Sequence, residues 1–496
     1  MEGELVIGIR TIPLIIVGVY LIIMLAFGFI VNKFLIKTST DYMLAGRRLG
    51  LIMVATTLSA NNIGGGSTMG VATRAFGDWG MSAAWWVLAA SVAMIPLAYF
   101  APRIRKTMAY TIPEVIFRRF GPTAGVFTSV LNITSLFTLT ASQILASGTV
   151  INVLVGIPLN VSIVLATVAI LIYTCLGGLT ADAYSDMFQY IIIFLGLIVA
   201  VPFVINGVGG GATMAESWAN VSAMLPPVQL SLTKIGWFTI ISLIINYFCT
   251  FLSGPEMVSR FSAAESEKSA QKASILSAIM MACMAFLPTL IGLAALASGQ
   301  LDNGGQALMW ATTNYAPEIV TGLVAAAMIS ATMSSADSNL LCASTIFIKD
   351  LYQQFINKGE ISEKKLIFLT RASNVVLGIF AMLIALRRID IITLNLFAFA
   401  LRSAGPFAAY GFGLMWPKAT KNAGLCAIAI GSVVAVAWEI AGHPLGVMPV
   451  IIGGASSALT FFLVTMIESA RGVPPAPSPN RPEAELAEVT EGAEGN

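Results

Sequence analysis

The sequence predicts an all-α integral membrane protein with about thirteen transmembrane helices. Composition is one reason, because 57% of the 496 residues are hydrophobic and only 10% are charged. The mean hydropathy of +0.85 is far above that of soluble globular proteins. Apolar runs of about 20 residues, long enough to cross a bilayer, also recur almost to the end of the chain. Basic residues, finally, concentrate in alternate loops between these runs.

Thirteen apolar segments are predicted to span the membrane. The first, 12–34, is longer than the core of a signal peptide and has no small-residue cleavage site after it, so we expect it to be retained. The others are 50–73, 79–101, 124–155, 158–178, 183–206, 236–253, 272–298, 320–347, 366–386, 390–416, 422–441 and 447–468.

The distribution of Lys and Arg sets the expected orientation. With the N-terminus outside, 21 of the 27 basic residues fall in cytoplasmic loops or in the C-terminal tail. The exceptions are Arg10, Arg74, Lys234, Arg387 and Arg388, which would lie outside, and Arg402, which lies within a span. We therefore predict a multi-pass plasma-membrane protein with an external N-terminus and a cytoplasmic C-terminus.

The second predicted span contains a stretch that is costly in lipid, A-N-N-I-G-G-G-S-T-M-G at residues 60–70. Glycine tolerates unusual backbone dihedrals and costs a helix about 1 kcal/mol per residue, so Gly64, Gly65 and Gly66 favour unwinding. Unwound carbonyls in the middle of the membrane suit a small hard cation such as Na⁺, as in secondary transporters. The alternative is that these glycines permit close packing of helices.

The ninth predicted span contains a second polar stretch, A-M-I-S-A-T-M-S-S-A-D-S-N at residues 327–339. At about 100° per residue, one face of this helix collects Ala331, Ser334, Ser335 and Ser338, with Asp337 about 60° beyond Ser334. A single serine often only bonds the preceding turn of its own helix. Clustering beside an intramembrane carboxylate favours a functional face instead.

Together with these two stretches, five further motifs make the chain resemble the sodium:solute symporter family, which includes proline, pantothenate, sialic acid and sugar cotransporters. They are D-Y-M-L-A-G-R-R-L at 41–49, T-I-P-E-V-I-F-R-R-F-G at 111–121, G-G-L-T-A-D-A-Y-S-D-M-F-Q at 177–189, G-P-E-M-V-S-R-F at 254–261 and W-P-K-A-T-K-N-A-G at 416–424. Each motif alone has low specificity, whereas the ordered set covers residues 41–424.

The resemblance implies a core of ten helices, spans two to eleven, made from two five-helix repeats of inverted topology. Spans two and seven would be its discontinuous helices. The expected divisions are a first helix and loop at 1–49, the two repeats at 50–206 and 207–416, two peripheral helices at 417–468, and a disordered cytoplasmic tail at 469–496.

In the family, a sodium site lies between the broken second span and the ninth span. Carried over to this sequence, it would use the carbonyls of Ala60, Ile63 and Ala331 and the hydroxyls of Ser334 and Ser335. Some members bind a second sodium ion nearer the cytoplasm, and the matching residues here are Asp186, Ser334, Asp337 and Ser338. Those members have serine where this chain has Asp337, which is either an added anionic ligand or a structural carboxylate.

Two aspartates open the sixth predicted span, where this residue type commonly caps a helix. We expect Asp182 to be such a cap. For Asp186 the family match leaves two interpretations open, a structural role and a role in sodium exit.

The resemblance places the solute on the outer side of the sodium site. The candidate residues are Asn62, Gly66, Ser67, Trp86, Gln143, Tyr247 and Thr250. Gln143 is favoured because it is a polar residue in an apolar helix, whereas tryptophan more often belongs to core packing or to the interfacial belt.

Arg402, in F-A-F-A-L-R-S-A-G-P-F, also needs a partner, because an unpaired guanidinium is costly in hydrocarbon. It would either form a structural ion pair or snorkel, or it would bind a substrate carboxylate. The last option favours a small organic anion or an amino acid over a sugar.

The predicted function is sodium-coupled uptake of a small organic solute by alternating access. Proton coupling and a membrane receptor with the same fold are the alternatives. An enzyme is not expected, because no His or Cys cluster has metal-ligand spacing and the few intramembrane carboxylates form no plausible acid–base pair. The expected partners are the solute, a sodium ion and membrane lipid, with neither nucleic acid nor an obligate protein partner.

Overall fold

The computed structural model describes residues 11–356 and 361–480, and every regular element in those two ranges is a helix. Ten of these helical segments are long and apolar enough to cross a bilayer, and two bent helix pairs raise the number to twelve. This confirms the predicted all-α membrane protein. The predicted second span is not among the twelve, because it is broken into pieces too short to cross a bilayer alone.

The long helices follow the predicted spans closely. They are α1 (Thr11–Leu35), α5 (Trp85–Lys106), α7 (Pro122–Val155), α8 (Leu159–Gly209), α12 (Glu267–Met284) with α13 (Phe286–Ser298), α15 (Glu318–Ile346), α16 (Glu363–Ala385), α19 (Lys421–Ile440) and α20 (Pro449–Ala470). α8 supplies two spans, because Gly178 interrupts it with φ 58°. Only glycine adopts that conformation readily, and a Cβ there would also collide with the ring of Tyr42.

Shorter elements connect or interrupt the spans. The α-helices among them are α2 (Ser39–Leu44), α6 (Ile112–Phe120), α9 (Met214–Ala223) and α14 (Ala307–Tyr315). Single 3₁₀ turns are η1 (Ala45–Arg47), η3 (Gly80–Ala84), η4 (Pro227–Leu230), η5 (Gly304–Gln306) and η7 (Pro444–Gly446). Two π-helical segments are η2 (Gly66–Gly70) and η6 (Phe347–Ile356).

Three membrane helices are broken, each at glycine. In the second span, α3 (Leu51–Asn62) ends before a turn at residues 63–65, after which η2 leads into α4 (Val71–Phe76). In the seventh, α10 (Gly236–Leu252) and α11 (Pro255–Ala263) meet at 56°, and in the eleventh, α17 (Ile391–Ser403) and α18 (Pro406–Met415) meet at 50°. The family resemblance led us to expect the first two breaks. The third was not predicted.

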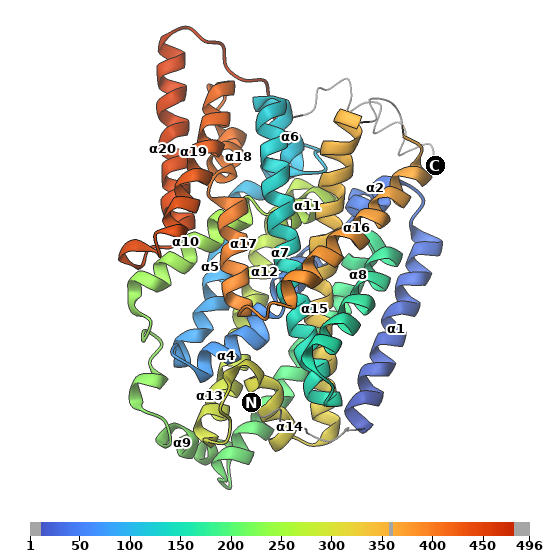
Figure 1. Ribbon diagram of the computed structural model, residues 1–496, viewed down its shortest axis with the longest axis vertical. Helices are drawn as coiled ribbons and strands as arrows, with labels where there is room; N and C mark the ends of the chain where they lie inside the picture. Colours follow the sequence, from blue (N-terminus) through green and yellow to red (C-terminus); the bar gives the residue numbers. More distant parts are fainter. Residues whose placement is uncertain (1–10, 357–360, 481–496) are drawn as a thin grey trace.

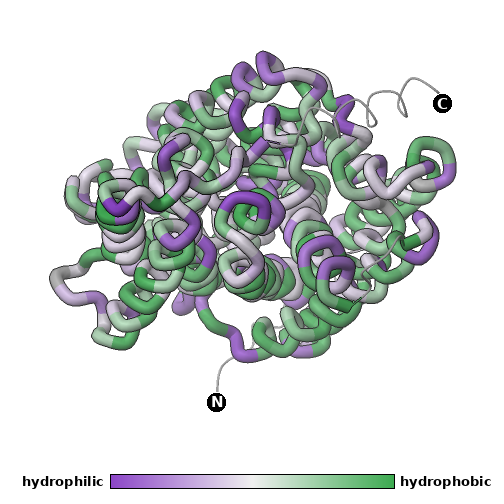
Figure 2. The backbone as a smooth tube through the Cα atoms, turned by 90° about the horizontal axis from the view of Figure 1, so that it is seen from above, coloured by the Kyte–Doolittle hydropathy of each residue, from purple (hydrophilic) through white to green (hydrophobic). Residues whose placement is uncertain are grey.

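α15 lies at the centre of the bundle. It packs against α7, α8 and α1, and nearly all of its residues are buried. α1 lies at one edge of the bundle in Figure 1, and α19 and α20 lie at the opposite edge. Seen from above, the helices form one bundle with hydrophobic residues recurring around its rim (Figure 2). Exposed isoleucines such as Ile22 and Ile23 of α1 belong to this rim, which suits contact with lipid.

The segment after α20 differs from the expectation of a disordered tail. Residues 471–480 return across the end of the bundle, where the Ala476 N–H donates to the carbonyl of Ala419 at 2.7 Å. The guanidinium of Arg119 in α6 donates to the carbonyl of Pro477, also at 2.7 Å. These contacts hold the segment against α6. The remainder of the expected tail, 481–496, lies outside the described residues.

Candidate ion and solute sites

The break between α3 and α4 brings main chain close to two other helices. The Gly65 N–H donates to the side-chain carbonyl of Gln143 in α7 at 2.7 Å. A Cβ at Gly64 would stand 2.5 Å from the hydroxyl of Ser335 in α15, and one at Gly65 would stand 2.5 Å from the Cβ of Ala146. The glycines therefore serve both proposed purposes, since they permit the break and also the close approach of α7 and α15.

The end of α3 meets α15 through main-chain oxygens. The Ser335 hydroxyl lies 2.8 Å from the carbonyl oxygen of Asn61 and 3.1 Å from that of Ala331. Ile63 follows α3 with non-helical φ −90° and ψ 61°. The last carbonyls of a helix lack the N–H partners that a continuing helix would supply. Two predicted ligands, Ala331 and Ser335, thus lie at the end of α3, whose final turn contains Ala60 and which Ile63 follows.

Ser334 points to a different set of groups. Its hydroxyl donates to Oδ1 of Asp186 in α8, and Oδ2 of the same carboxylate accepts from the Thr57 hydroxyl in α3. In this structure Ser334 therefore contacts the carboxylate predicted for the second sodium ion, while Ser335 contacts the break. Both serines are buried.

Arg260 of α11 joins these groups to a second carboxylate. Its Nη2 lies 2.8 Å from Oδ2 of Asp182 and 3.5 Å from Oδ2 of Asp186. Its Nε lies 2.9 Å from the Thr57 hydroxyl, and the Ser338 hydroxyl donates to Oδ2 of Asp182 at 2.8 Å. All of these side chains are fully buried, so we refer to Thr57, Asp182, Asp186, Arg260, Ser334 and Ser338 as the Arg260 cluster.

The Arg260 cluster corrects two expectations. Asp182 is not a helix cap, because it lies inside α8 and accepts hydrogen bonds from Arg260 and Ser338. Arg260 is not a loop residue on the cytoplasmic side, because α11 continues the seventh span beyond its predicted end. Asp337 does not join the cluster. Its buried carboxylate lies near Thr174 of α8 without a hydrogen bond of good geometry, so its place in a second sodium site stays a prediction.

A small cavity of about 50 Å³ adjoins the break on the other side of Ser335. Most of the predicted solute residues line it: Asn62, Gly66, Ser67, Trp86, Gln143, Tyr247 and Arg402. Thr250 is the exception, because it lies outside the lining and accepts a hydrogen bond from Ser403 at 3.1 Å. Ser335 and Asn61 line the cavity as well as meeting at the break.

Arg402 has an anionic partner in the cavity wall. Its Nη1 lies 2.6 Å from Oε2 of Glu256, and both side chains are buried. Arg402 therefore forms a buried ion pair, while its binding of a substrate carboxylate stays a prediction. Arg402 Nε is buried and has no hydrogen-bond partner within residues 11–356 and 361–480.

Three buried rings form another wall of the cavity. Trp86 lies 5.5 Å from Tyr247 and 6.4 Å from Phe399 between ring centroids, and Tyr247 lies 5.7 Å from Phe399. Edge-to-face and offset packing of this kind favours a tight apolar closure. The three rings therefore limit the size of the cavity on this side.

Several polar residues of these sites were not singled out in the sequence, Thr57 of the Arg260 cluster and Asn61 of the cavity among them. Glu256 and Arg260 belong to the G-P-E-M-V-S-R-F motif, and the glycine and proline that open it were the available signal of a broken span. Asn339 and Asn395 also line the cavity. Each is an amide in an apolar helix, the same signal that pointed to Gln143.

Comparisons with known proteins agree with this geometry. The sequence model of the sodium:solute symporter family matches residues 42–431. The high-affinity proline transporter PutP of Bacillus subtilis is 28% identical over 471 residues, which cover 90% of this chain and 96% of that transporter. The sodium/proline symporter of Escherichia coli is 27% identical, with 93% and 95% covered. The sodium/glucose cotransporter of Vibrio parahaemolyticus is 27% identical, with 85% and 84% covered.

Solved structures share the fold. A Na⁺-coupled sialic acid symporter in a substrate-bound outward-open state matches with a TM-score of 0.78 at 20% identity, covering 95% of this chain and 99% of that one. Mhp1, a nucleobase-cation-symport-1 family transporter in a closed conformation, matches with a TM-score of 0.58 at 14% identity, covering 86% and 95%. The likeness extends over nearly the whole bundle.

Proposed function

We propose that this chain, which belongs to the sodium:solute symporter family, takes up a small carboxylate-bearing solute, with an amino acid favoured, together with sodium. Several similar proteins are proline transporters or sodium/proline symporters, which supports both the ion and the solute class. The observation that carries the proposal is the position of Ser335. Its hydroxyl contacts the broken main chain at Asn61 and also lines the solute cavity.

The proposed sodium site uses the carbonyls of Ala60, Ile63 and Ala331 with the hydroxyls of Ser334 and Ser335. Oxygen donors from uncharged groups suit Na⁺, and carbonyls released by a helix break are a recurrent source of them. Ser335 already spans Asn61 and Ala331. Ser334 would turn from Asp186 to complete the set, so ion binding would also loosen the Arg260 cluster.

A second ion would use Asp186 with Ser334, Asp337 and Ser338. The burial of Asp186 beside two hydroxyls supports an ion path through this position. Arg260 already supplies a positive charge there, so a second sodium ion requires the guanidinium to withdraw. The number of ions carried per solute therefore depends on this movement.

Solute recognition is proposed to rest on the Arg402–Glu256 pair. Arg402 would bind a solute carboxylate, and Glu256 would bind an ammonium group, which together favour a zwitterion. Gln143, Asn62 and Ser67 would supply further hydrogen bonds from the cavity wall. The present volume is too small for such a solute, so binding requires the wall of Trp86, Tyr247 and Phe399 to open.

Coupling follows from the shared position of the two sites. Sodium that fixes α3 against α15 would pre-form the cavity, so sodium and solute must raise each other's affinity by the same factor. Uptake requires the cavity to open toward the outside first. The positive-inside distribution of Lys and Arg supports an external N-terminus for this direction.

Proteoliposome uptake tests the proposal. Radiolabelled proline and a panel of small carboxylates would be offered under an inward sodium gradient, a potassium gradient or a proton gradient. We expect uptake under the sodium gradient alone, and we expect Ser334→Ala and Ser335→Ala to weaken its sodium dependence sharply. Uptake that followed the proton gradient and ignored sodium would refute the coupling, while leaving the fold unaffected.

A further inference from the structure

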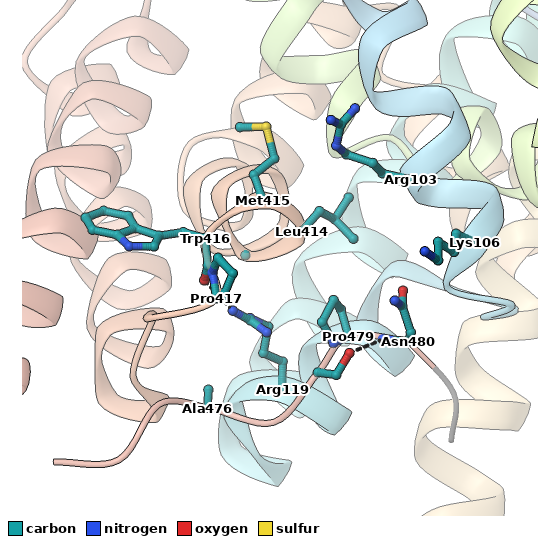
Figure 3. A pocket seen from close by; sticks show the side chains of 12 residues that line it. Arg103, Lys106, Arg119, Leu414, Met415, Trp416, Pro417, Ala476, Pro479 and Asn480 are labelled. Atoms are coloured by element: carbon teal, nitrogen blue, oxygen red, sulfur yellow. Dashed lines mark hydrogen bonds between the residues drawn. The ribbon is translucent and has the colours of Figure 1, made fainter. Parts of the chain in front are cut away.

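A basic pocket lies at the end of the bundle that carries α6 and the C-terminal segment, the end predicted to be cytoplasmic. It has a volume of about 410 Å³ and lies between α5, α6, the end of α18 and residues 476–480. Figure 3 shows its three cationic side chains, Arg103, Lys106 and Arg119. Its lining contains no aspartate or glutamate.

Arg119 brings a buried charge to this pocket without a carboxylate beside it. The side chain is 2% exposed, and its two terminal nitrogens donate to the carbonyls of Trp416 and Pro477 at 2.6 and 2.7 Å. Its Nε has no hydrogen-bond partner among the described residues. Burial lowers the pKa of Arg119, as expected for a cation held only by neutral groups. An anion in the pocket would relieve this cost.

Arg103 and Lys106 add two more charges at the end of α5. Arg103 packs over the ring of Tyr99, 3.8 Å from its centroid, and donates to the Tyr99 carbonyl. Lys106 is exposed. Within residues 11–356 and 361–480, neither forms an ion pair, so the pocket presents three positive charges that the described protein does not neutralise.

The surroundings of the pocket match the interface of a membrane. Arg103 and Lys106 end a membrane span, and Leu414, Met415 and Trp416 end another, supplying an apolar and aromatic wall. Tryptophan and basic residues at helix ends commonly mark the depth of lipid headgroups. Basic pockets between membrane helices on the cytoplasmic side suit phosphate-bearing headgroups.

We propose that this basic pocket binds a phosphate group, carried either by an anionic phospholipid of the adjoining leaflet or by a soluble phosphate. Arg119 supplies a fixed charge at the base, and Arg103 and Lys106 close over the phosphate from α5. Because Arg119 also binds the carbonyl of Pro477, the occupied pocket would hold residues 476–480 against α6.

Another possible source of negative charge lies further along the chain. The sequence after Asn480 contains Glu483, Glu485, Glu488, Glu491 and Glu494, with one arginine. These glutamates give that part of the sequence a net negative charge. A chain truncated after Asn480 therefore belongs in the test.

Native mass spectrometry of the purified full-length chain would measure binding of short-chain phosphatidylglycerol, with phosphatidylcholine as the zwitterionic comparison. Thermal shift would measure binding of inorganic phosphate. The test variant is the double substitution Arg103→Gln and Lys106→Gln, which leaves buried Arg119 in place. The matched control is Lys364→Gln with Lys365→Gln, two exposed lysines at the predicted cytoplasmic side that do not line the pocket.

We expect phosphatidylglycerol to bind in preference to phosphatidylcholine, with affinity reduced roughly 5-fold per charge removed and about 25-fold in the test variant. Phosphate binding with the same sensitivity would support the site and identify a soluble source. Equal phosphatidylglycerol binding by the wild type, the test variant and the control would overturn the proposal. Binding that occurs only in the truncated chain would also overturn it, because the glutamates would then occupy the pocket.

Discussion

The breaks in the second and seventh spans use different chemistry for related tasks. The break after α3 consists of Ile63 and glycines, so it presents main chain to Ser335 and Gln143. The break after α10 is instead followed by α11, whose charged side chains Glu256 and Arg260 lie inside the bundle. One break presents neutral main-chain oxygens to α15, and the other supplies charges that pair across the protein. A broken membrane helix can therefore expose main-chain oxygens, or it can place charged side chains inside the bundle.

Removal of the Arg260 charge is expected to have the largest effect. In Arg260→Gln, Asp182 and Asp186 would remain buried without their cation, which costs about 3–5 kcal/mol. We expect a large fall in thermal stability and loss of uptake. Lys268→Gln removes an exposed charge nearby in sequence and serves as the control. Wild-type stability in Arg260→Gln would show that the charges of α11 do not hold the bundle.

Glu256, the other charged residue that α11 places in the bundle, is expected to affect solute binding. Glu256→Gln leaves Arg402 without its anionic partner, a change that typically costs about 2–5 kcal/mol in a buried pair. We expect a higher KM for amino acids and a smaller change for carboxylates without an amino group, measured by uptake in proteoliposomes. Glu439→Gln, at an exposed position, is the control. An equal change in KM for both solute classes would show that Glu256 has a purely structural role.

The glycine break should respond to a single methyl group. In Gly65→Ala the new Cβ would stand 2.5 Å from the Cβ of Ala146, and such overpacking costs about 1–3 kcal/mol. We expect reduced sodium affinity with a modest loss of stability. Gly18→Ala places its methyl group in open space and is the matched control. If the two variants behaved alike, the close approach of α7 to the break would have no functional role.

Composition and periodicity were sufficient for the all-α fold and for most spans, because each membrane helix must satisfy its backbone internally and expose apolar side chains. Ser335 and Gln143 were predictable because a polar side chain in an apolar membrane helix is costly and therefore indicates a specific contact. The partners of Arg260 and Arg402 were not predictable, because which charged side chains meet depends on how the helices are rotated relative to one another. The end of the seventh span was misjudged because Pro255 resembles a helix terminus.

Order along the chain also concealed which serines act together. Ser334 and Ser335 are neighbours, and the resemblance assigned both to the first sodium ion and Ser334 also to a second ion beside Asp186. In the structure an angle of about 100° separates neighbouring helical residues, and it directs Ser334 to α8 and Ser335 to α3. Ser334 thus contacts the carboxylate assigned to the second ion, and Ser335 contacts the main chain assigned to the first.

The most direct test of the account is a sodium titration of thermal stability in the purified chain, with potassium at constant ionic strength. Ligand binding to the folded state stabilises it by RT ln(1 + c/Kd), where c is the free ligand concentration, so a weaker site needs a higher ligand concentration for the same stabilisation. The account predicts stabilisation by sodium in the wild type and in Ser344→Ala, whose hydroxyl only bonds Leu341 on the same helix. In Ser335→Ala the required sodium concentration should rise about 10-fold or more, the loss of one strong ligand contact. A Ser335→Ala titration that coincides with the wild type would contradict a sodium ion held between α3 and α15.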